Sequence, residues 1–122
     1  EKGLIPFNVK SKSDDINSPI SERVQPPLEQ WLRGFYDAEF VVTDSFHACV
    51  FSILFNKPFI VYGNRKRGLS RFESLLNIFG FKNLLITNIS EYQNINKPTW
   101  KIVNEILDNH RKHAFAFFSK YN

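Results

Sequence analysis

Residues 40–62 decide the fold, and they read FVVTDSFHACVFSILFNKPFIVY. A run rich in β-branched residues ends at the polar triplet Thr43-Asp44-Ser45, and an apolar segment of helical length then leads to a second strand-like run. The pattern predicts a strand at 40–44, a helix at 45–55 and a strand at 59–62. His47 would lie about one turn into this helix, at the strand end where open α/β sheets bind their ligands.

The segment before this unit changes character at Pro27. Residues 8–27 are rich in Ser, Asp, Asn and Pro, which is typical of a loop or linker. Residues 27–38 carry apolar side chains at the spacing of one helix face, and the pair Pro26 and Pro27 suits a helix start. We therefore predict an amphipathic helix at 27–38 that packs on the sheet.

The segment after residue 62 predicts a third helix. Ser70 and Glu73 have the spacing of a capping box, and Gly80 follows the apolar face as a stop signal. The remaining elements are expected to be a short strand at 84–87, a polar loop at 88–98 and a helix from Thr99 to about residue 119.

Alternation of strands and helices predicts a parallel sheet with helices on its faces, joined by right-handed crossovers. The helix at 45–55 is apolar on nearly every side, so we expect it between the sheet and another layer. The predicted class is a Rossmann-like three-layer α/β/α fold in one domain over residues 1–122, with a loop or linker at 1–26 and a folded unit at 27–122. Because the chain begins at Glu1 and has no Met, we expect it to be part of a longer protein.

Charge and cysteine content limit the function classes. The formal net charge is +4, from 16 Lys and Arg against 12 Asp and Glu, which allows an anionic ligand without requiring nucleic acid. The single cysteine, Cys49, excludes an internal disulfide, and its place in an apolar helix predicts a buried, inert thiol. No apolar run reaches the ~20 residues of a membrane span, so no transmembrane segment is expected.

His47 is the first candidate for chemistry, because imidazole accepts and donates protons near neutral pH. Asp44 or Ser45 is expected to cap the first free N–H groups of the helix. A Ser/His/Asp triad is rejected, since neighbouring helical residues point in different directions. A cap or a satisfied core histidine remains an alternative role for His47.

A basic loop is the second candidate. Arg65, Lys66, Arg67 and Arg71 follow the second strand, so they should emerge at the same sheet edge as His47. Guanidinium groups bind phosphate and carboxylate bidentately, although exposed basic turns are also common without a ligand.

Metal and nucleotide cofactors are not expected. His110 and His113 lie three residues apart on the last predicted helix, but no third ligand stands at a recognisable spacing. The sequence also has no Gly-rich dinucleotide fingerprint and no P-loop.

Four stretches together resemble the C-terminal half of the polysaccharide pyruvyl transferase family, over about residues 25–85. They are QPPLEQWL at 25–32, VVTDSFH at 41–47, FNKPFI at 55–60 and NRKRGLSRF at 64–72. The Ser-Phe-His, helix, Asn-Lys-Pro, strand order is the specific part of this resemblance.

The resemblance implies the donor-binding, C-terminal domain of a two-domain enzyme like the GT-B glycosyltransferases, with an N-terminal domain that precedes this chain. The reaction it implies transfers pyruvate from phosphoenolpyruvate to two hydroxyls of a sugar as a ketal, with a glycan or lipid-linked sugar as acceptor in bacterial capsule or surface-polysaccharide synthesis. His47 would be the general acid, and Asp44, Ser45, Arg65, Arg67 and Arg71 would hold the donor. The implied location is the cytoplasm, including the inner membrane face, and the chain alone is expected to be inactive.

One position departs from the family. Many members carry Arg two residues before the histidine, where this sequence has Ser45. Either Arg65, Arg67 or Arg71 supplies the charge, or this subgroup uses a different donor or a different reaction. The alternatives are a GT-B glycosyltransferase half that binds a nucleotide sugar and a non-catalytic interaction domain that uses its aromatic-rich helices.

Overall fold

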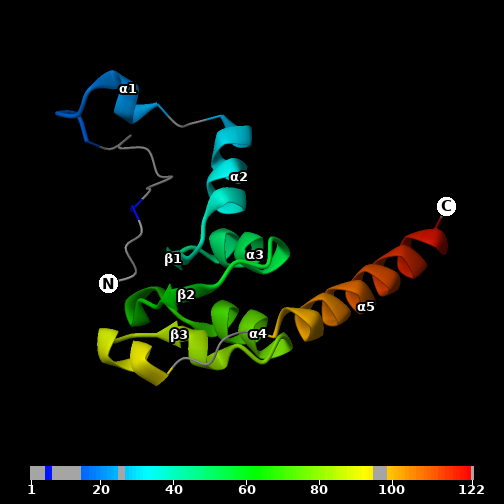
Figure 1. The fold of residues 1–122 in the computed structure, drawn as a ribbon. Coiled ribbons are helices and arrows are strands. Elements are labelled where there is room, and N and C mark those ends of the chain that lie inside the picture. Colours follow the sequence, from blue (N-terminus) through cyan, green and yellow to red (C-terminus); the bar gives the residue numbers. More distant parts are fainter. Residues whose placement is uncertain (1–4, 7–14, 25–26, 95–98, 122) are drawn as a thin grey trace. The chain divides into compact units, whose positions relative to one another are not determined.

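The computed structural model describes residues 5–6, 15–24, 27–94 and 99–121 (Figure 1). The chain divides into two compact units, residues 1–39 and residues 40–122. The first unit contains α1 (Ile20–Arg23) and α2 (Leu28–Asp37). Phe35 is buried, and the ring of Trp31 meets its ring edge-on at a centroid distance of 4.7 Å.

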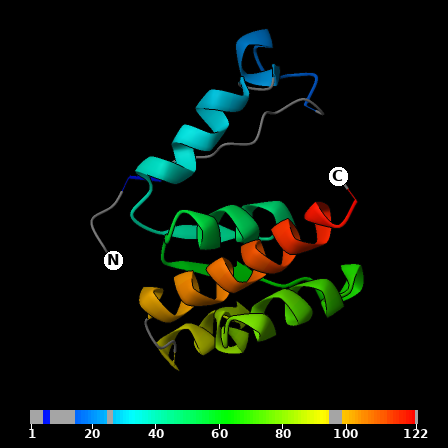
Figure 2. The ribbon, with the colours of Figure 1, turned by 90° about the vertical axis from the view of Figure 1, so that its right-hand side faces the viewer.

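The second unit contains a parallel sheet of three strands in the order β1-β2-β3. Each strand is followed by a helix or turn, and Figure 2 shows α3 and α4 running roughly along the strands that they connect. The α/β prediction with a parallel sheet is therefore confirmed. In chain order the elements are β1 (Val41–Thr43), α3 (Phe46–Leu54), β2 (Phe59–Tyr62), η1 (Arg65–Arg67), α4 (Ser70–Ile78), η2 (Lys82–Leu84), β3 (Leu85–Ile86), η3 (Ile89–Asn94) and α5 (Trp100–Ser119).

The core of the second unit lies where α3 and α4 meet the sheet. The central strand β2 is buried over its first three residues, whereas Val42 of the neighbouring strand β1 is 66% exposed. α3 contacts both β1 and β2, whereas α4 contacts β3. The fully buried side chains are Cys49, Ser52, Ile53, Phe59, Val61, Leu76, Leu84, Ile86 and Val103.

A left-handed residue ends α3 and sends the chain into β2. Asn56 has φ 56°, a conformation that Asn tolerates better than other residues with a side chain. The N–H of the next residue, Lys57, donates to the Ser52 carbonyl at 2.8 Å, so a carbonyl of the last helical turn is satisfied. The Asn56 side-chain oxygen is buried and has no hydrogen-bond partner among the described residues.

The start of α4 differs from the predicted capping box. Ser70 is the first helical residue and Leu69 is the N-cap, which makes no side-chain cap hydrogen bond. Leu69 already has helical backbone angles, φ −115° and ψ −7°, and its carbonyl accepts the Glu73 N–H at 2.9 Å. The predicted cap was wrong by one residue. Leu69 lies beside Gly63, and its carbonyl already accepts a hydrogen bond from the helix, so Leu69 takes the cap position instead of Ser70. At the other end the predicted stop is confirmed, with Gly80 at φ 72°.

Two stretches read as loops contain helical turns. α1 lies within residues 8–27, and η3 occupies the first part of the loop predicted at 88–98. η3 is supported locally, since Asn88 accepts the Ser90 N–H at 3.3 Å. Pro26 and residues 95–98 lie outside the described part of the chain.

α5 is only partly packed. Val103 is buried and the Trp100 ring meets Phe81 edge-on, whereas residues 109–121 are exposed. Figure 1 shows the C-terminal half of α5 clear of the sheet and of α3 and α4. No helix within the described residues is both long and apolar enough to cross a membrane.

Candidate functional site

A pocket of about 690 Å³ opens where the three strands end. Asp44 follows β1, Tyr62 to Arg65 end and follow β2, and Thr87 and Asn88 follow β3. Parallel strands bring their carboxyl ends to one edge, which is where ligands of open α/β sheets bind. The lining residues are Asp44, Tyr62, Gly63, Asn64, Arg65, Thr87, Asn88 and Glu91.

Gly63 lines the pocket at the end of β2, where neighbouring side chains pack closely against its backbone. Its N–H donates to the Ile86 carbonyl at 2.8 Å, so the backbone after β2 stays tied to β3. A Cβ on Gly63 would lie 2.7 Å from Leu69 Cδ2 and 3.0 Å from Leu85 Cδ1. A side chain at this position would therefore push on both leucines.

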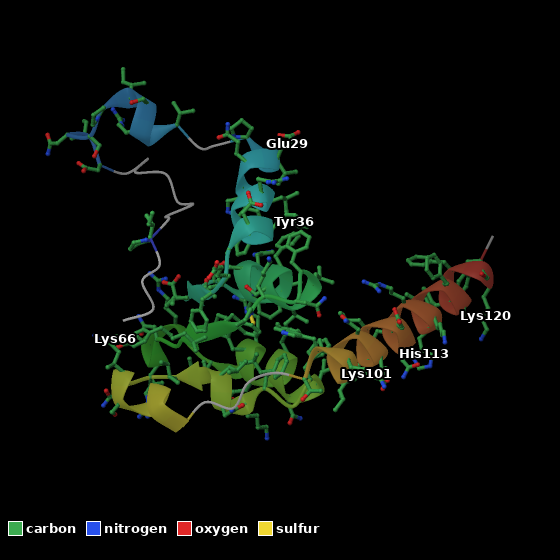
Figure 3. The ribbon with its side chains drawn as sticks, viewed as in Figure 1. Glu29, Tyr36, Lys66, Lys101, His113 and Lys120 are labelled. Carbon is green, nitrogen blue, oxygen red and sulfur yellow. The ribbon has the colours of Figure 1, made fainter. Side chains whose placement is uncertain are left out.

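Side-chain hydrogen bonds shape the two loops that border the pocket. Asn64 accepts the Lys66 N–H at 3.0 Å and so caps η1, the turn that carries the basic residues; Figure 3 labels Lys66 on it. Thr87 donates its hydroxyl to a Glu91 carboxylate oxygen at 3.1 Å. The residues that line the pocket carry a guanidinium, two carboxylates, two amides and two hydroxyls, a set that suits a polar ligand with several hydroxyl groups.

The first turn of α3 forms a second group at the same end of β1. Ser45 is the N-cap, because its hydroxyl accepts the Ala48 N–H at 3.5 Å and its own N–H donates to Thr43 Oγ1 at 2.9 Å. His47 is exposed in this turn. The Phe46 ring contacts the neighbouring His47 ring at a centroid distance of 6.2 Å.

Arg71 reaches this turn from the start of α4. Its guanidinium lies over the Phe46 ring, 5.3 Å from the centroid, and the adjacent Phe72 ring is 6.0 Å from the same ring. Cation–π contact fixes a guanidinium without neutralising it. A positive charge from the second crossover therefore lies next to the residue that precedes His47.

The expected inert cysteine is confirmed as a buried thiol. Cys49 is fully buried in α3, and burial raises the pKa of its thiol to about 12. Since only the thiolate is a good nucleophile, the buried Cys49 thiol is a poor nucleophile at neutral pH.

The predicted site residues fall into two neighbouring sets. Asp44 and Arg65 line the pocket, whereas His47 and Arg71 each contact the Phe46 ring and are not among the residues that line it. Ser45 acts as a helix cap, and Arg67 is exposed on η1.

Sequence reasoning missed four polar pocket residues, Asn64, Thr87, Asn88 and Glu91. Their signal was available for three of the four, because Thr87 directly follows an apolar strand-like run, and Asn64 and Asn88 follow such a run after one intervening residue, as Asp44 does.

Comparison with known proteins gives one match. The family model described as Polysaccharide pyruvyl transferase matches residues 4–66, slightly more than half of the chain. The matched range includes Asp44, Ser45, His47 and Arg65 and ends before Arg67 and Arg71. No curated protein and no solved structure matches the chain.

Proposed function

The chain belongs to the polysaccharide pyruvyl transferase family, and we propose that it binds the donor, phosphoenolpyruvate, for transfer of pyruvate to a sugar. The observation that carries this proposal is the Arg71 guanidinium over Phe46, one residue from His47. Because the His47 and Arg71 side chains each contact the Phe46 ring, a cation and a candidate proton donor both lie near the N-terminus of α3, where free N–H groups also favour an anion.

Arg71 takes the place of the arginine that many family members carry where this chain has Ser45. The residue comes from α4 rather than α3, but its guanidinium reaches the same helical turn through Phe46. The pocket is a poorer phosphate site, because Asp44 and Glu91 add two carboxylates beside Arg65. We assign the phosphate and carboxylate of the donor to Arg71 and the start of α3, and sugar hydroxyls to the pocket.

In the proposed reaction His47 donates a proton to the methylene carbon of the enolpyruvyl group, which becomes a methyl group. One sugar hydroxyl then attacks the central carbon, phosphate leaves with the electrons of the C–O bond, and the second hydroxyl closes the ketal. The two hydroxyl protons balance the new methyl hydrogen and the protonated phosphate. Arg71 would stabilise the charge that develops on the leaving phosphate.

Donor binding tests this assignment by a rescue. Titration calorimetry with phosphoenolpyruvate should show at least about tenfold weaker binding for Arg71→Ala, and partial recovery when Ser45→Arg is added to it. Arg111→Ala, the same change at an exposed site on α5, is the matched control and should bind like the wild type. Equal affinity for Arg71→Ala and wild type would refute the role of Arg71.

The catalytic step needs a separate readout. With an acceptor sugar and the full-length protein, phosphate release should stop in His47→Ala while donor affinity stays within about threefold of wild type. Unchanged phosphate release in His47→Ala would exclude it as the acid.

Glu91 supports a second candidate, a GT-B-type half that binds a nucleotide sugar. Its carboxylate lines the same pocket as Arg65, so a ribose and a diphosphate would find an acceptor and a cation together. Binding of a nucleoside diphosphate that weakens in Glu91→Gln but not in Glu105→Gln, with none of phosphoenolpyruvate, would favour it over the first proposal.

A further inference from the structure

The C-terminal half of α5 carries an exposed aromatic cluster that continues a buried stripe. Trp100, Val103, Ile106 and Leu107 begin this stripe and are buried or half-buried. Ala114, Phe117, Phe118 and Tyr121 continue it at helical spacing. There Phe117 is 58% exposed, Phe118 62% and Tyr121 76%.

The aromatic rings gather together in spite of their exposure. The Phe117 ring lies 5.7 Å from that of Phe118 and 5.2 Å from that of Tyr121, centroid to centroid. Phe115, 70% exposed, extends the cluster by one turn. Scattered apolar residues are common on protein surfaces, but a contiguous aromatic cluster marks a contact with another phase or molecule.

Basic residues border this aromatic cluster on both sides. Arg111 and Lys112 precede Phe115 by four and three residues, and His113 and Lys120 flank Phe117 at the same spacings, so they are its neighbours on the helix surface. Figure 3 shows His113 and Lys120 projecting from the same side of α5. After Asp108 the sequence contains no Asp or Glu, so this half of the helix is cationic.

We propose that the C-terminal half of α5 binds an anionic lipid surface as an interfacial helix. Phenylalanine and tyrosine on one face with lysine and arginine beside them is the pattern of helices that lie in the headgroup region. Lysine and arginine side chains bordering the cluster reach lipid phosphates while their stems cover the acyl boundary. A second copy of the chain is a poorer occupant, because pairing through this stripe brings Lys112 and Lys120 of both copies together, and the nearest carboxylate in the sequence, Asp108, already pairs with Arg111 at 2.9 Å.

Vesicle sedimentation with the whole chain, in the absence of donor, tests this proposal. Vesicles containing phosphatidylglycerol should retain the protein, and vesicles of phosphatidylcholine alone should not, with binding reduced by high salt. Phe117→Ala with Phe118→Ala should weaken binding at least about tenfold, whereas Ile89→Ala, an apolar residue 79% exposed outside α5, should not.

Two variants that each remove one lysine charge separate the electrostatic contribution to lipid binding from an effect on folding. Lys120→Gln should weaken binding about fivefold, and Lys101→Gln, the same change at the packed end of α5, should leave it unchanged. Circular dichroism should give the same helix content for all these proteins. Equal binding to both vesicle types, or binding that survives the double phenylalanine change, would overturn the proposal, as would a dimer in solution that the double change converts to monomer.

Discussion

The two crossovers of the sheet differ in how firmly they are held. α3 places four residues in the core, Ala48, Cys49, Ser52 and Ile53, whereas α4 buries only Leu76 among its nine residues. Both helices begin at the edge where the candidate site lies, yet one carries His47 and the other Arg71. The proton-transfer candidate therefore lies on a helix with four buried residues, and the cation lies on a more exposed helix whose one buried residue, Leu76, is near its C-terminal end.

Side-chain truncation should show the largest difference in stability between α3 and α4. Ile53→Ala in α3 should lower the free energy of unfolding by about 3 kcal/mol, because it empties a site that is only 2% exposed. Ile78→Ala in α4, at 48% exposure, should cost less than about 1 kcal/mol. Urea unfolding of both variants measures the difference, and equal losses would mean that α4 is packed as firmly as α3.

Alkaline pH should reveal the buried thiol of α3. The raised pKa of Cys49, about 12, means that the unfolded chain loses its proton first as the pH rises past about 9. Stability is therefore lost progressively between these two values, by about 1–2 kcal/mol between pH 8 and pH 10.

The difference between wild type and a variant without the thiol isolates the contribution of Cys49 from those of all other groups. The loss should be present in wild type and absent in Cys49→Ala, measured as the difference between their urea midpoints at each pH. Parallel pH profiles for the two proteins would show that solvent reaches the thiol.

A methyl group on Gly63 should loosen the second crossover. Gly63→Ala places a Cβ against Leu69 and Leu85, so we expect a loss of about 1–2 kcal/mol as both side chains shift. Because Leu69 is the N-cap of α4, Arg71 should be displaced as well, and phosphoenolpyruvate affinity should fall with stability.

Gly80→Ala, past the other end of α4, serves as the control for Gly63→Ala. It meets no atom within 4 Å, but its positive φ of 72° makes the alanine strained. It should lower stability by about 1 kcal/mol without changing donor affinity. If both glycine variants keep full affinity, the anchoring of α4 does not position the cation.

The cap of α3 should give the smallest effect. The hydrogen bond from the Ala48 N–H to Ser45 is long, 3.5 Å, so Ser45→Ala should cost only about 0.5 kcal/mol. A thermal melt would record a shift of a few degrees at most. A loss of more than about 2 kcal/mol in the free energy of unfolding would show that the Ser45 cap contributes more to holding α3 in place than its buried residues do.

The elements of the first crossover could be read from sequence because their signals are local. β2 was predicted at its observed bounds, and α3 ends one residue earlier and begins one residue later than expected, with Ser45 as one of the two caps proposed. The start of α4 could not be predicted in this way, since Leu69 is half-buried beside Gly63, and a local capping pattern does not encode that contact. Tertiary packing therefore set this boundary.

The candidate site was only partly predictable for the same reason. Asp44 and Arg65 follow strands, and the rule on carboxyl ends placed them at one edge. Two features could not be predicted: the contact of Arg71 with Phe46 and the place of Glu91 in the pocket. Both depend on how the segments between and after the strands pack against one another, which residue spacing does not encode.

Asn56, the residue with a left-handed backbone conformation after α3, also limits which amino acids can replace it in related sequences. Glycine adopts a positive φ without strain. It would also remove the buried side-chain oxygen that has no hydrogen-bond partner among the described residues, so exchange between Asn and Gly should be tolerated. A β-branched residue would be refused, because it would have to hold a backbone conformation that such side chains almost never adopt. Natural variation at this turn should therefore be nearly binary, even where the surrounding core varies widely.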